Sequence, residues 1–415
     1  MNHSTDWIAE RVFCQPPHDP SFYNDPYALY KSLHERGGPV FWKDYGFWCL
    51  TEFEAVSATL KDPRFARLPP PGSATEKSPQ HLKDFAQVER HSLLQLEPPT
   101  HTRLRKRVNR AFVARQIDTM AAGIEALVND CIDQFIDARS CDLLTELATP
   151  VPVTVIAQLL GVPLELKDEL LRWSHDMVKV YTMTQSTDEE RVANTSAAEF
   201  RHCLVELIEQ KRKRGHANKQ ASDQNDLLSL LANDEDPDTL LTNDEIVSVA
   251  VLLLNAGHEA TVHQFGNLIF NLLKNDCAPR GGFTSLQEGK RTIDEGLRHD
   301  APLHLFLRYA QTDTELAPGI ILPAGDQIAL LLGAANRDPK RFKQPDVFWP
   351  NRPDGAHVSL GAGIHFCIGA ALAGLELRIM VDTLFKRIPN LQLAETPQYK
   401  NLFHFHGLEQ LPVRW

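Results

Sequence analysis

The longest continuous pattern of apolar positions lies in the second half of the chain. Residues 246–254 are apolar on nearly every side of a helix, and they follow Thr242-Asn-Asp-Glu245, which has the spacing of a helix-capping box. A helix that is apolar all round belongs inside the molecule rather than on its surface. The sequence therefore predicts a helix that begins near Thr242 and crosses the centre of the fold.

The remaining pattern predicts a helical middle with short strands on either side of it. Periodicity indicates a helix over residues 27–36, strands within 40–50 and 319–332, largely helical structure over 99–274, and a helix over 370–388. Residues 68–91, which contain three consecutive prolines, read as a long irregular loop. Residues 215–236 and 335–352 also read as loops. The pattern is typical of a mainly α fold with a small β region.

Composition excludes several classes of protein. A hydrophobic content of 43% and a charged content of 23% are typical of soluble globular proteins, and the length of 415 residues allows one large domain or two to three smaller ones. The net charge of −11 argues against a nucleic-acid partner. Residues 1–20 are polar and lack the pattern of a signal peptide or membrane anchor, so we expect a cytoplasmic protein. Seven scattered cysteines do not suggest a disulfide framework.

Cys367 lies in a segment suited to binding a metal ion, Ser359-Leu-Gly-Ala-Gly-Ile-His-Phe-Cys-Ile-Gly369, directly before the predicted helix over 370–388. Gly361 and Gly363 permit positive φ angles and close approach of a flat ligand, and Gly369 leaves the sulfur uncovered. The start of a helix favours an anionic sulfur, because its unpaired N–H groups and its dipole are positive. Cys367 is therefore the predicted metal ligand, and the other six cysteines read as small buried residues.

This segment resembles the signature of the cytochrome P450 superfamily, in which one Cys thiolate binds haem iron. The resemblance extends from about residue 26 to residue 415, and Leu360 stands where the family usually has Phe. It implies haem b (iron protoporphyrin IX), held between the long central helix and the loop and helix of the Cys ligand. It also implies one domain over residues 1–415, of which we expect residues 1–25 to form an irregular extension.

The central helix contains a second motif of the family in Asn255-Ala-Gly-His-Glu-Ala-Thr261. Gly in a helix costs about 1 kcal/mol relative to Ala, and a buried carboxylate needs a partner, so Gly257 and Glu259 need a functional reason. Family members carry Ala-Gly-x-Glu-Thr-Thr over the iron. The resemblance implies that Ala256 and Gly257 form the oxygen groove and that Glu259 passes protons to it, whereas we expect His258 to be a packing residue.

Ala260 is the main departure from the family, which usually has Thr at this position to assist cleavage of the O–O bond. Thr261 follows one position later and falls on a different helix face. Some family members also have Ala here, and in them a substrate hydroxyl and ordered water replace the missing group. Two explanations remain open for this chain: the substrate assists proton delivery, or another residue or water acts without it.

Glu295-Gly-Leu-Arg298 matches the Glu-x-x-Arg motif of the family, whose members pair it with an Arg from a late loop, here Arg352. The resemblance implies a structural ion-pair network behind the haem. The same spacing occurs in Glu209-Gln-Lys-Arg212, where an exposed helix face is the better interpretation. The order of the later motifs along the chain selects Glu295.

The segment that begins at Glu97 resembles the helix that crosses the haem propionates. At about 100° per residue, His101 and Arg105 fall on the apolar face with Leu104, Val108 and Phe112, where they need an anion such as a propionate. Arg308 and His365 complete this clamp by family position. The opposite face is basic and is predicted to dock an acidic ferredoxin; its residues are Arg103, Lys106, Arg107 and Arg110. The alternative interpretation is an ordinary basic surface helix.

The resemblance also places a substrate pocket over the haem. Its expected lining comprises the loop over 68–91 and five single residues: Asn255, Leu303, His304, Phe403 and Phe405. A mostly apolar cavity with a few polar groups favours a hydrophobic molecule that bears some oxygen, such as a terpenoid, polyketide or steroid. For His304, contact with a propionate or simple packing is the alternative.

The activity implied by the resemblance is that of a soluble, bacterial-type monooxygenase, present as a monomer. It would hydroxylate or otherwise oxidise a small molecule with dioxygen, using electrons from a separate ferredoxin and its reductase, because the chain has no flavin or nicotinamide fingerprint. Two alternatives are a peroxide-using or oxidative-coupling enzyme, and a haem-thiolate sensor or carrier without turnover.

Overall fold

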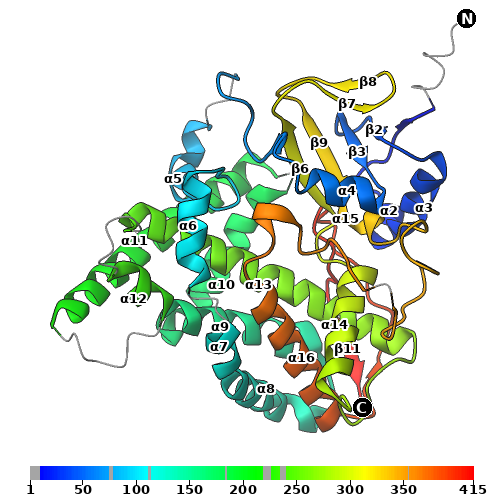
Figure 1. The fold of residues 1–415 in the computed structure, drawn as a ribbon. Helices are drawn as coiled ribbons and strands as arrows, with labels where there is room; N and C mark the ends of the chain where they lie inside the picture. Colours follow the sequence, from blue (N-terminus) through cyan, green and yellow to red (C-terminus); the bar gives the residue numbers. More distant parts are fainter. Residues whose placement is uncertain are drawn as a thin grey trace, which may run out of the picture.

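The structure is a computed structural model that describes residues 10–73, 78–110, 114–182, 185–217, 226–233, 240–353 and 355–415. Helices make up most of it, and a six-stranded sheet lies toward one side (Figure 1). In spatial order, the strands of this sheet are β1 (Val12–Phe13), β2 (Val40–Trp42), β3 (Phe47–Leu50), β9 (Gln327–Leu331), β6 (Leu305–Ala310) and β4 (Phe65–Ala66).

The six-stranded sheet joins the two ends of the helical middle. β3 pairs with β9 in parallel, with Trp48 opposite Ile328, so strands about 280 residues apart in the sequence lie side by side. The smaller sheets consist of β10 (Gln392–Leu393), β11 (Pro412–Arg414) and β5 (Ser140–Asp142), and of β7 (Thr314–Ala317) and β8 (Ile320–Leu322). The strands predicted within residues 40–50 and 319–332 are confirmed.

The helices follow a chain order that agrees with the predicted helical middle. The α-helices are α2 (Pro20–Asn24), α3 (Tyr27–Arg36), α4 (Phe53–Thr59), α5 (Lys83–Glu89), α6 (Thr100–Asn109), α7 (Ala114–Thr119), α8 (Ala121–Phe135), α9 (Pro150–Leu160), α10 (Lys167–Val178), α11 (Thr187–Ala217), α12 (Leu227–Ala232), α13 (Asn243–Lys274), α14 (Leu286–His299), α15 (Leu332–Ala335) and α16 (Ala370–Arg387). Short 3-10 or π turns are η1 (Gln80–Leu82), η2 (Ile136–Ala138), η3 (Leu144–Ala148), η4 (Leu164–Leu166), η5 (Lys179–Tyr181) and η6 (Gly363–His365).

α13 is the central helix that the apolar pattern predicted. It begins with the predicted capping box: the Thr242 hydroxyl accepts from the Glu245 amide at 3.3 Å, and the Glu245 carboxylate accepts from the Thr242 amide at 2.9 Å. Helices α9, α10, α14 and α16 pack around it (Figure 1). Among the described helices only α13 is long and apolar enough to cross a membrane, and 83% of its most apolar window is buried within the protein.

Three segments predicted to be irregular contain regular structure. The loop predicted over residues 68–91 includes η1 and α5, the one over 215–236 includes α12, and residues 10–25 include β1 and α2. Each of these helices has seven residues or fewer, which is too short for a clear periodic signal. They form because their apolar side chains pack against the core; Phe85 and Val88 of α5 and Leu228 of α12 are buried.

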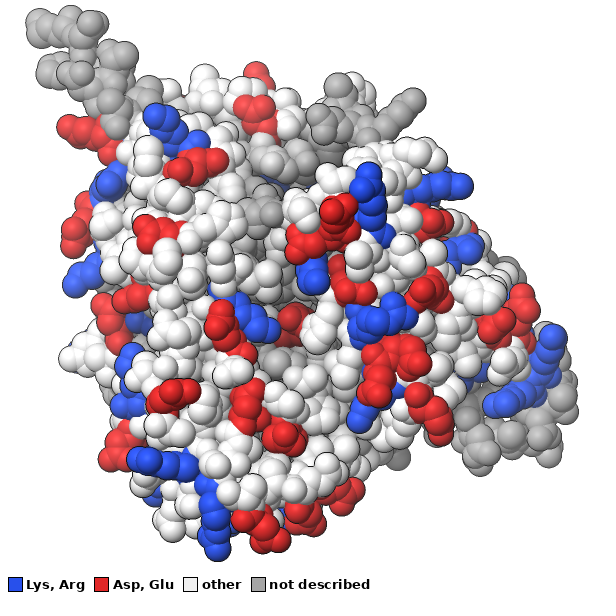
Figure 2. All heavy atoms as spheres, turned by 180° about the vertical axis from the view of Figure 1, so that it is seen from behind, with Lys and Arg blue, Asp and Glu red and all other residues white. Residues whose placement is uncertain are grey.

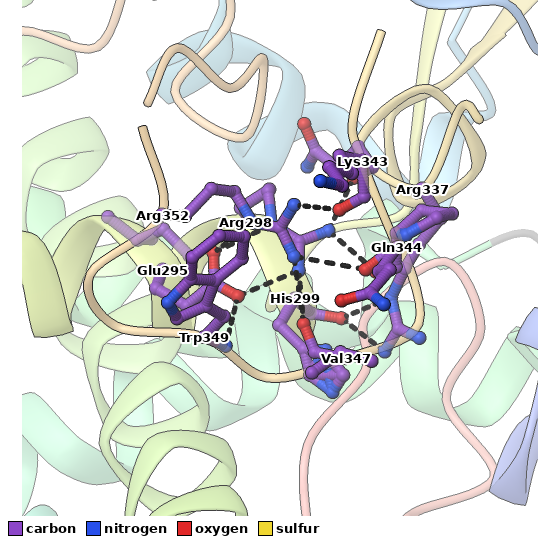
Figure 3. A network of polar contacts seen from close by, with 12 residues as sticks. Glu295, Arg298, His299, Arg337, Lys343, Gln344, Val347, Trp349 and Arg352 are labelled. Atoms are coloured by element: carbon purple, nitrogen blue, oxygen red, sulfur yellow. Dashed lines mark hydrogen bonds and ion pairs between the residues drawn. The ribbon is translucent and has the colours of Figure 1, made fainter. Parts of the chain in front are cut away.

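The predicted ion-pair network joins α14 to the loop that follows α15 (Figure 3). Arg298 donates from Nε and Nη2 to the two oxygens of Glu295, both at 2.8 Å, and Arg352 donates to the same carboxylate at 3.3 Å. The Trp349 amide also donates to Glu295, at 2.7 Å. Both arginines donate to backbone carbonyls of the loop, including that of Val347. The network therefore fixes a loop that has no helix or strand of its own.

We expect the replacement of Arg298 by Ala to destabilise the protein by about 3–5 kcal/mol, because Glu295 would keep its buried charge and lose its bidentate partner. Denaturant unfolding followed by circular dichroism measures this change. Arg191→Ala is the matched control, because Arg191 pairs with Asp188 on the exposed face of α11 and its removal should leave the unfolding midpoint nearly unchanged. Equal losses in the two variants would contradict a stabilising role for the network.

Candidate functional site

Close packing of backbone against backbone fixes the loop that carries Cys367. Gly363 has a φ angle of +69°, and a Cβ atom there would lie 2.7 Å from the Leu60 carbonyl oxygen, so only glycine fits. The Cys367 amide donates to the Leu360 carbonyl at 2.9 Å. A Cβ atom on Gly369 would already touch the sulfur, at 4.0 Å. The loop therefore presents the Cys367 sulfur in front of α16 with little to cover it.

The backbone N–H contribution expected at Cys367 has the predicted sign, but burial outweighs it. Burial raises the pKa of its thiol above the usual value, and the Gly369 amide and Arg105 only partly oppose this effect. The physical reason is position: α16 begins three residues later, at Ala370, and a single backbone amide reaches the sulfur. A bound metal cation would supply the stabilisation of the thiolate that the helix start does not.

Cys367 and the motif over residues 255–261 of α13 face a common space. A cavity of about 120 Å³ is lined by Cys367 and by Ala256, Gly257, Ala260 and Thr261. A second cavity, of about 390 Å³, shares Ala256 and Ala260 with the first. The structure thus brings the predicted thiolate and the predicted groove to the walls of one space, although they lie more than 100 residues apart in the sequence.

An arginine and two histidines lie where they could donate hydrogen bonds to the carboxylates of a porphyrin. Arg308 and His365 line the larger cavity, and burial lowers the pKa of Arg308 to about 10. The ring of His101 lies 4.6 Å from that of His365, and its Nε2 atom has no hydrogen-bond partner within the described segments. One cysteine ligand, an arginine with two histidines, and small residues on α13 fit an iron porphyrin.

Arg67 is a residue of this cavity that sequence reasoning missed. It lines the larger cavity, and its guanidinium donates to the carbonyls of Leu94 and Leu307 at 2.7 and 3.1 Å. Its sequence context gives no signal, since it is a single Arg before a run of prolines. Arg105, in contrast, lines neither cavity; it donates to the Phe366 carbonyl at 2.5 Å and so joins α6 to the Cys367 loop.

The predicted basic face of α6 is smaller than expected. Arg107 is buried, with only 9% of its surface exposed, and Arg103 forms an ion pair with Glu245 of α13. Lys106 and Arg110 are exposed, as predicted. The single-face assignment failed because α6 is in contact over more than one face, which helical phase alone does not reveal. The predicted partner Phe112 lies outside the described residues.

Glu259 is surrounded by three histidine rings. Its Oε2 atom lies 3.5 Å from His175 Nε2 and 3.7 Å from His258 Nδ1, and its Oε1 atom lies 3.4 Å from His263 Nε2. Burial raises the pKa of this carboxyl, but contact with the histidines, chiefly His263, outweighs burial and holds the pKa well below its usual range. The packing role predicted for His258 is therefore incomplete, and His175 and His263 were missed.

The predicted substrate-pocket residues divide into two groups. Asn255, Leu303 and Phe405 line the larger cavity. His304 and Phe403 do not: both are buried in the aromatic core, and the Tyr30 hydroxyl lies 2.9 Å from His304 Nδ1. His304 directly follows Leu303, and successive side chains of an extended segment point to opposite sides.

The loop over residues 68–91 was also predicted to line the pocket, and it does not appear in either cavity wall within the described residues. The residues that flank this segment do so instead: Arg67 before it, and Leu94 and Gln95 after it. His404 and Tyr181 complete the polar part of the lining. Glu376 lies in the wall of the smaller cavity, where burial raises its pKa to about 8, and nothing in the sequence pattern indicated this.

Comparison of the sequence with protein families gives one match over most of the chain. The profile of the family described as Cytochrome P450 matches residues 21–277 and 289–401. The chain is 34% identical over 401 residues to the Biotin biosynthesis cytochrome P450 of Bacillus subtilis (strain 168), with 94% of this chain and 96% of the relative covered. It is 32% identical over 409 residues to the 6-deoxyerythronolide B hydroxylase of Saccharopolyspora erythraea, with 95% and 97% covered.

Solved structures agree with this match. The crystal structure of P450BioI in complex with hexadec-9Z-enoic acid ligated acyl carrier protein superimposes with a TM-score of 0.85 at 32% identity, covering 96% of this chain and 100% of that one. The structure of epothilone D-bound cytochrome P450epoK also gives a TM-score of 0.85, at 27% identity, covering 97% and 99%. The mainly helical fold with small sheets is thus that of solved P450 structures.

Cys367→Ala should abolish the red-shifted absorption of the reduced carbon monoxide complex, because that band requires a thiolate ligand on the haem iron. Visible spectroscopy of the purified, reduced protein measures this band. Cys203→Ala is the control, since Cys203 lies half-buried on α11, away from both cavities, and its removal should leave the band intact. Persistence of the band in Cys367→Ala would refute the assignment of the ligand.

Proposed function

Because the chain belongs to the cytochrome P450 family, and is thereby a haem-dependent monooxygenase of small molecules, we propose that it oxidises a hydrophobic substrate that carries oxygen groups. The observation that carries this proposal is the larger cavity, which shares Ala256 and Ala260 with the cavity of Cys367. A molecule bound there would lie next to the site of oxygen activation. Hydroxylation is the reaction proposed first, with electrons supplied by a separate ferredoxin.

Two polar atoms in the larger cavity support an oxygen-bearing substrate. Asn255 donates from Nδ2 to the Tyr181 hydroxyl at 3.4 Å, which leaves its buried Oδ1 atom without a partner among the described residues. His404 Nδ1 is also buried, with no hydrogen bond to any described residue. Unpaired buried polar atoms are costly, so a substrate hydroxyl or carbonyl that pairs with them would be bound selectively in an otherwise apolar cavity.

Different residues of the chain have different proposed roles around the haem. Haem bound at Cys367 supplies the activation of dioxygen, and Arg308, His365 and His101 are the groups that would hold its carboxylates. Ala256, Gly257 and Ala260 leave space on α13, because none of them has a side chain longer than a methyl group. The apolar remainder of the walls excludes water, which strengthens the electrostatic interactions of the groups that remain.

Glu259 is proposed to deliver protons. Its carboxylate oxygens lie 3.4 to 3.7 Å from nitrogens of three histidine rings, so protons can pass between these groups. His175 is half exposed and lies 3.5 Å from Glu259, which gives protons a path from the surface. Glu259 directly precedes Ala260, which lines both cavities, and this adjacency supports the proposed role.

Ala260 leaves a gap in this path that Thr261 does not fill. The Thr261 hydroxyl donates to the Gly257 carbonyl at 2.8 Å, and so its proton is already engaged within the helix. We propose that an oxygen of the substrate, with ordered water, takes the place of the missing hydroxyl. A peroxide-driven reaction is the second candidate, because it would not need this proton path.

The proposed docking surface for the electron donor surrounds the Cys367 loop. Ile364 and Phe366 are 50% and 44% exposed on either side of His365. Lys106 on α6 and Arg110 directly after it are also exposed, and Arg105 joins α6 to the loop. An apolar centre with basic groups beside it suits an acidic protein partner. On the opposite face of the molecule, basic and acidic side chains are interspersed (Figure 2).

Substrate-assisted proton delivery predicts that a deoxy analogue of the substrate binds and accepts electrons but diverts them to hydrogen peroxide. Coupling, the product formed per NADPH consumed, should fall with the analogue, because the positioned proton donor would be missing. Ala260→Thr should restore part of the coupling with the analogue, and Glu259→Gln should slow turnover of both compounds. Equal coupling for substrate and analogue in the wild type would contradict the substrate's role, and turnover supported by added peroxide alone would favour the second candidate.

The docking surface is tested by reversing two charges, in the double variant Lys106→Glu and Arg110→Glu. Reduction by an acidic ferredoxin should slow and lose part of its salt dependence, because the encounter depends on opposite charges. Stopped-flow spectroscopy measures the rate, and unchanged haem content and substrate binding show that the fold is intact. The control carries Lys213→Glu and Arg214→Glu on α11, and a similar slowing in this control would show that only net charge matters.

A further inference from the structure

We propose that His175, His258 and Glu259 form a binding site for a divalent transition-metal ion, with Zn²⁺ as the best-suited ion. The site is separate from Cys367, because none of its three residues lines either cavity. His175 comes from α10, and the other two are adjacent residues of α13. The three ligand atoms, one ring nitrogen from each histidine and one carboxylate oxygen, all lie within 4.8 Å of one another.

The distances are close to those that a tetrahedral ion requires. Zinc binds histidine nitrogen and carboxylate oxygen at about 2.0–2.2 Å, which places ligand atoms roughly 3.4 Å apart. Glu259 Oε2 already lies 3.5 Å from His175 Nε2 and 3.7 Å from His258 Nδ1. The two histidine nitrogens lie within 4.8 Å of each other, and the half-exposed side chain of His175 has the freedom to adjust this distance.

His258 provides an independent reason to expect a ligand at this place. Its side chain is only 1% exposed, and neither of its ring nitrogens has a hydrogen-bond partner among residues that the structure describes. A buried imidazole normally donates from one nitrogen and accepts at the other, and leaving both unpaired is unfavourable. A metal ion bound at Nδ1 would satisfy the nitrogen that points at Glu259.

Neighbouring groups are arranged as they are around known metal sites. His263 Nε2 lies 3.4 Å from Oε1 of Glu259, the oxygen that does not face the other two histidines, and so it orients the carboxylate. Half of the His175 side chain is exposed, which gives an ion a path of entry and leaves a coordination position for water. Two imidazoles and one carboxylate form a ligand set that favours Zn²⁺ and Cu²⁺ over Mg²⁺ or Ca²⁺.

A second cluster of similar composition, around Asp300, differs because its carboxylate is fully hydrogen-bonded. Asp300 lies near His304 and His406, but its carboxylate accepts from the hydroxyls of Tyr27 and Tyr399 at 2.8 and 2.6 Å and from Asn271 at 2.8 Å. Asp300, His304 and His406 are deeply buried, and His304 is bonded to Tyr30. The carboxylate of that cluster is already fully engaged, and the cluster ties distant parts of the chain together.

Occupancy of the site would inhibit the enzyme. An ion on Oε2 would hold the Glu259 carboxylate in one position and compete with protons for it, so proton delivery should slow. This consequence rests on the proposed role of Glu259 in proton transfer. The binding of the ion does not rest on it, and the two statements can therefore fail separately.

Zinc binding is measured by isothermal titration calorimetry on the haem-containing, substrate-free protein, prepared without a histidine tag. We expect one ion per chain and a loss of at least tenfold in affinity in His175→Ala and in His258→Gln. His202→Ala is the matched control, because His202 is 79% exposed and lies 3.3 Å from Glu206 on α11; its affinity should equal that of the wild type. Absence of saturable binding, or equal affinity in His175→Ala, would overturn the site.

Turnover measurements test the inhibition by zinc separately from the binding of zinc. Zinc should slow product formation in the wild type and in His202→Ala, and a chelator should restore the rate. In His175→Ala the same zinc concentration should have at least tenfold less effect. Zinc that binds at the predicted residues without slowing turnover would uphold the metal site and refute the proton-transfer role of Glu259.

Discussion

The rest of the structure depends on the placement of one sulfur atom in an apolar cavity. Burial opposes ionisation of Cys367, so the protein alone does not hold a thiolate there, and an iron cation bound to the sulfur reverses that balance. For the ligand to work, its loop must keep a fixed distance from α13. The contact of Gly363 with the Leu60 backbone, and the contact of Arg105 with Phe366, fix this loop from two sides.

Buried charged groups serve two different purposes in this protein. The two can be distinguished by whether the groups and their neighbours form all of their hydrogen bonds. The Glu295 carboxylate accepts from two arginines and a backbone amide, and Asp300 accepts from two tyrosines and an asparagine. Networks satisfied in this way hold elements together. The histidines around Glu259 lack hydrogen bonds at several ring nitrogens, which is the condition expected where a proton, water or ion is exchanged.

The two cavities share a wall on α13. Ala256 and Ala260 contribute only methyl groups there, so the space on either side is joined by small residues rather than divided by large ones. Glu259 lies next to this wall in the sequence but faces the histidines of α10 and α13. The helix thereby separates an apolar side, suited to substrate, from a polar side that reaches solvent through His175.

The sequence alone determined the central helix, its capping box, the Cys367 segment and the Glu295 motif, because these depend on local spacing and on residues with few other uses. It also indicated which residues of α13 face a shared cavity. The sequence pattern did not predict short helices such as α5 and α12. A helix of six or seven residues is stabilised by contacts with the core, and it is too short to show a clear periodicity.

Only the tertiary structure decided which side chains meet. Arg107 is buried because α6 is packed on more than one face, and His304 lies in the aromatic core because an extended segment turns adjacent side chains to opposite sides. The ring of histidines around Glu259 combines α10 with two successive turns of α13, and no spacing within one segment could reveal it. Long-range packing sets these neighbours, and it is absent from any local pattern in the sequence.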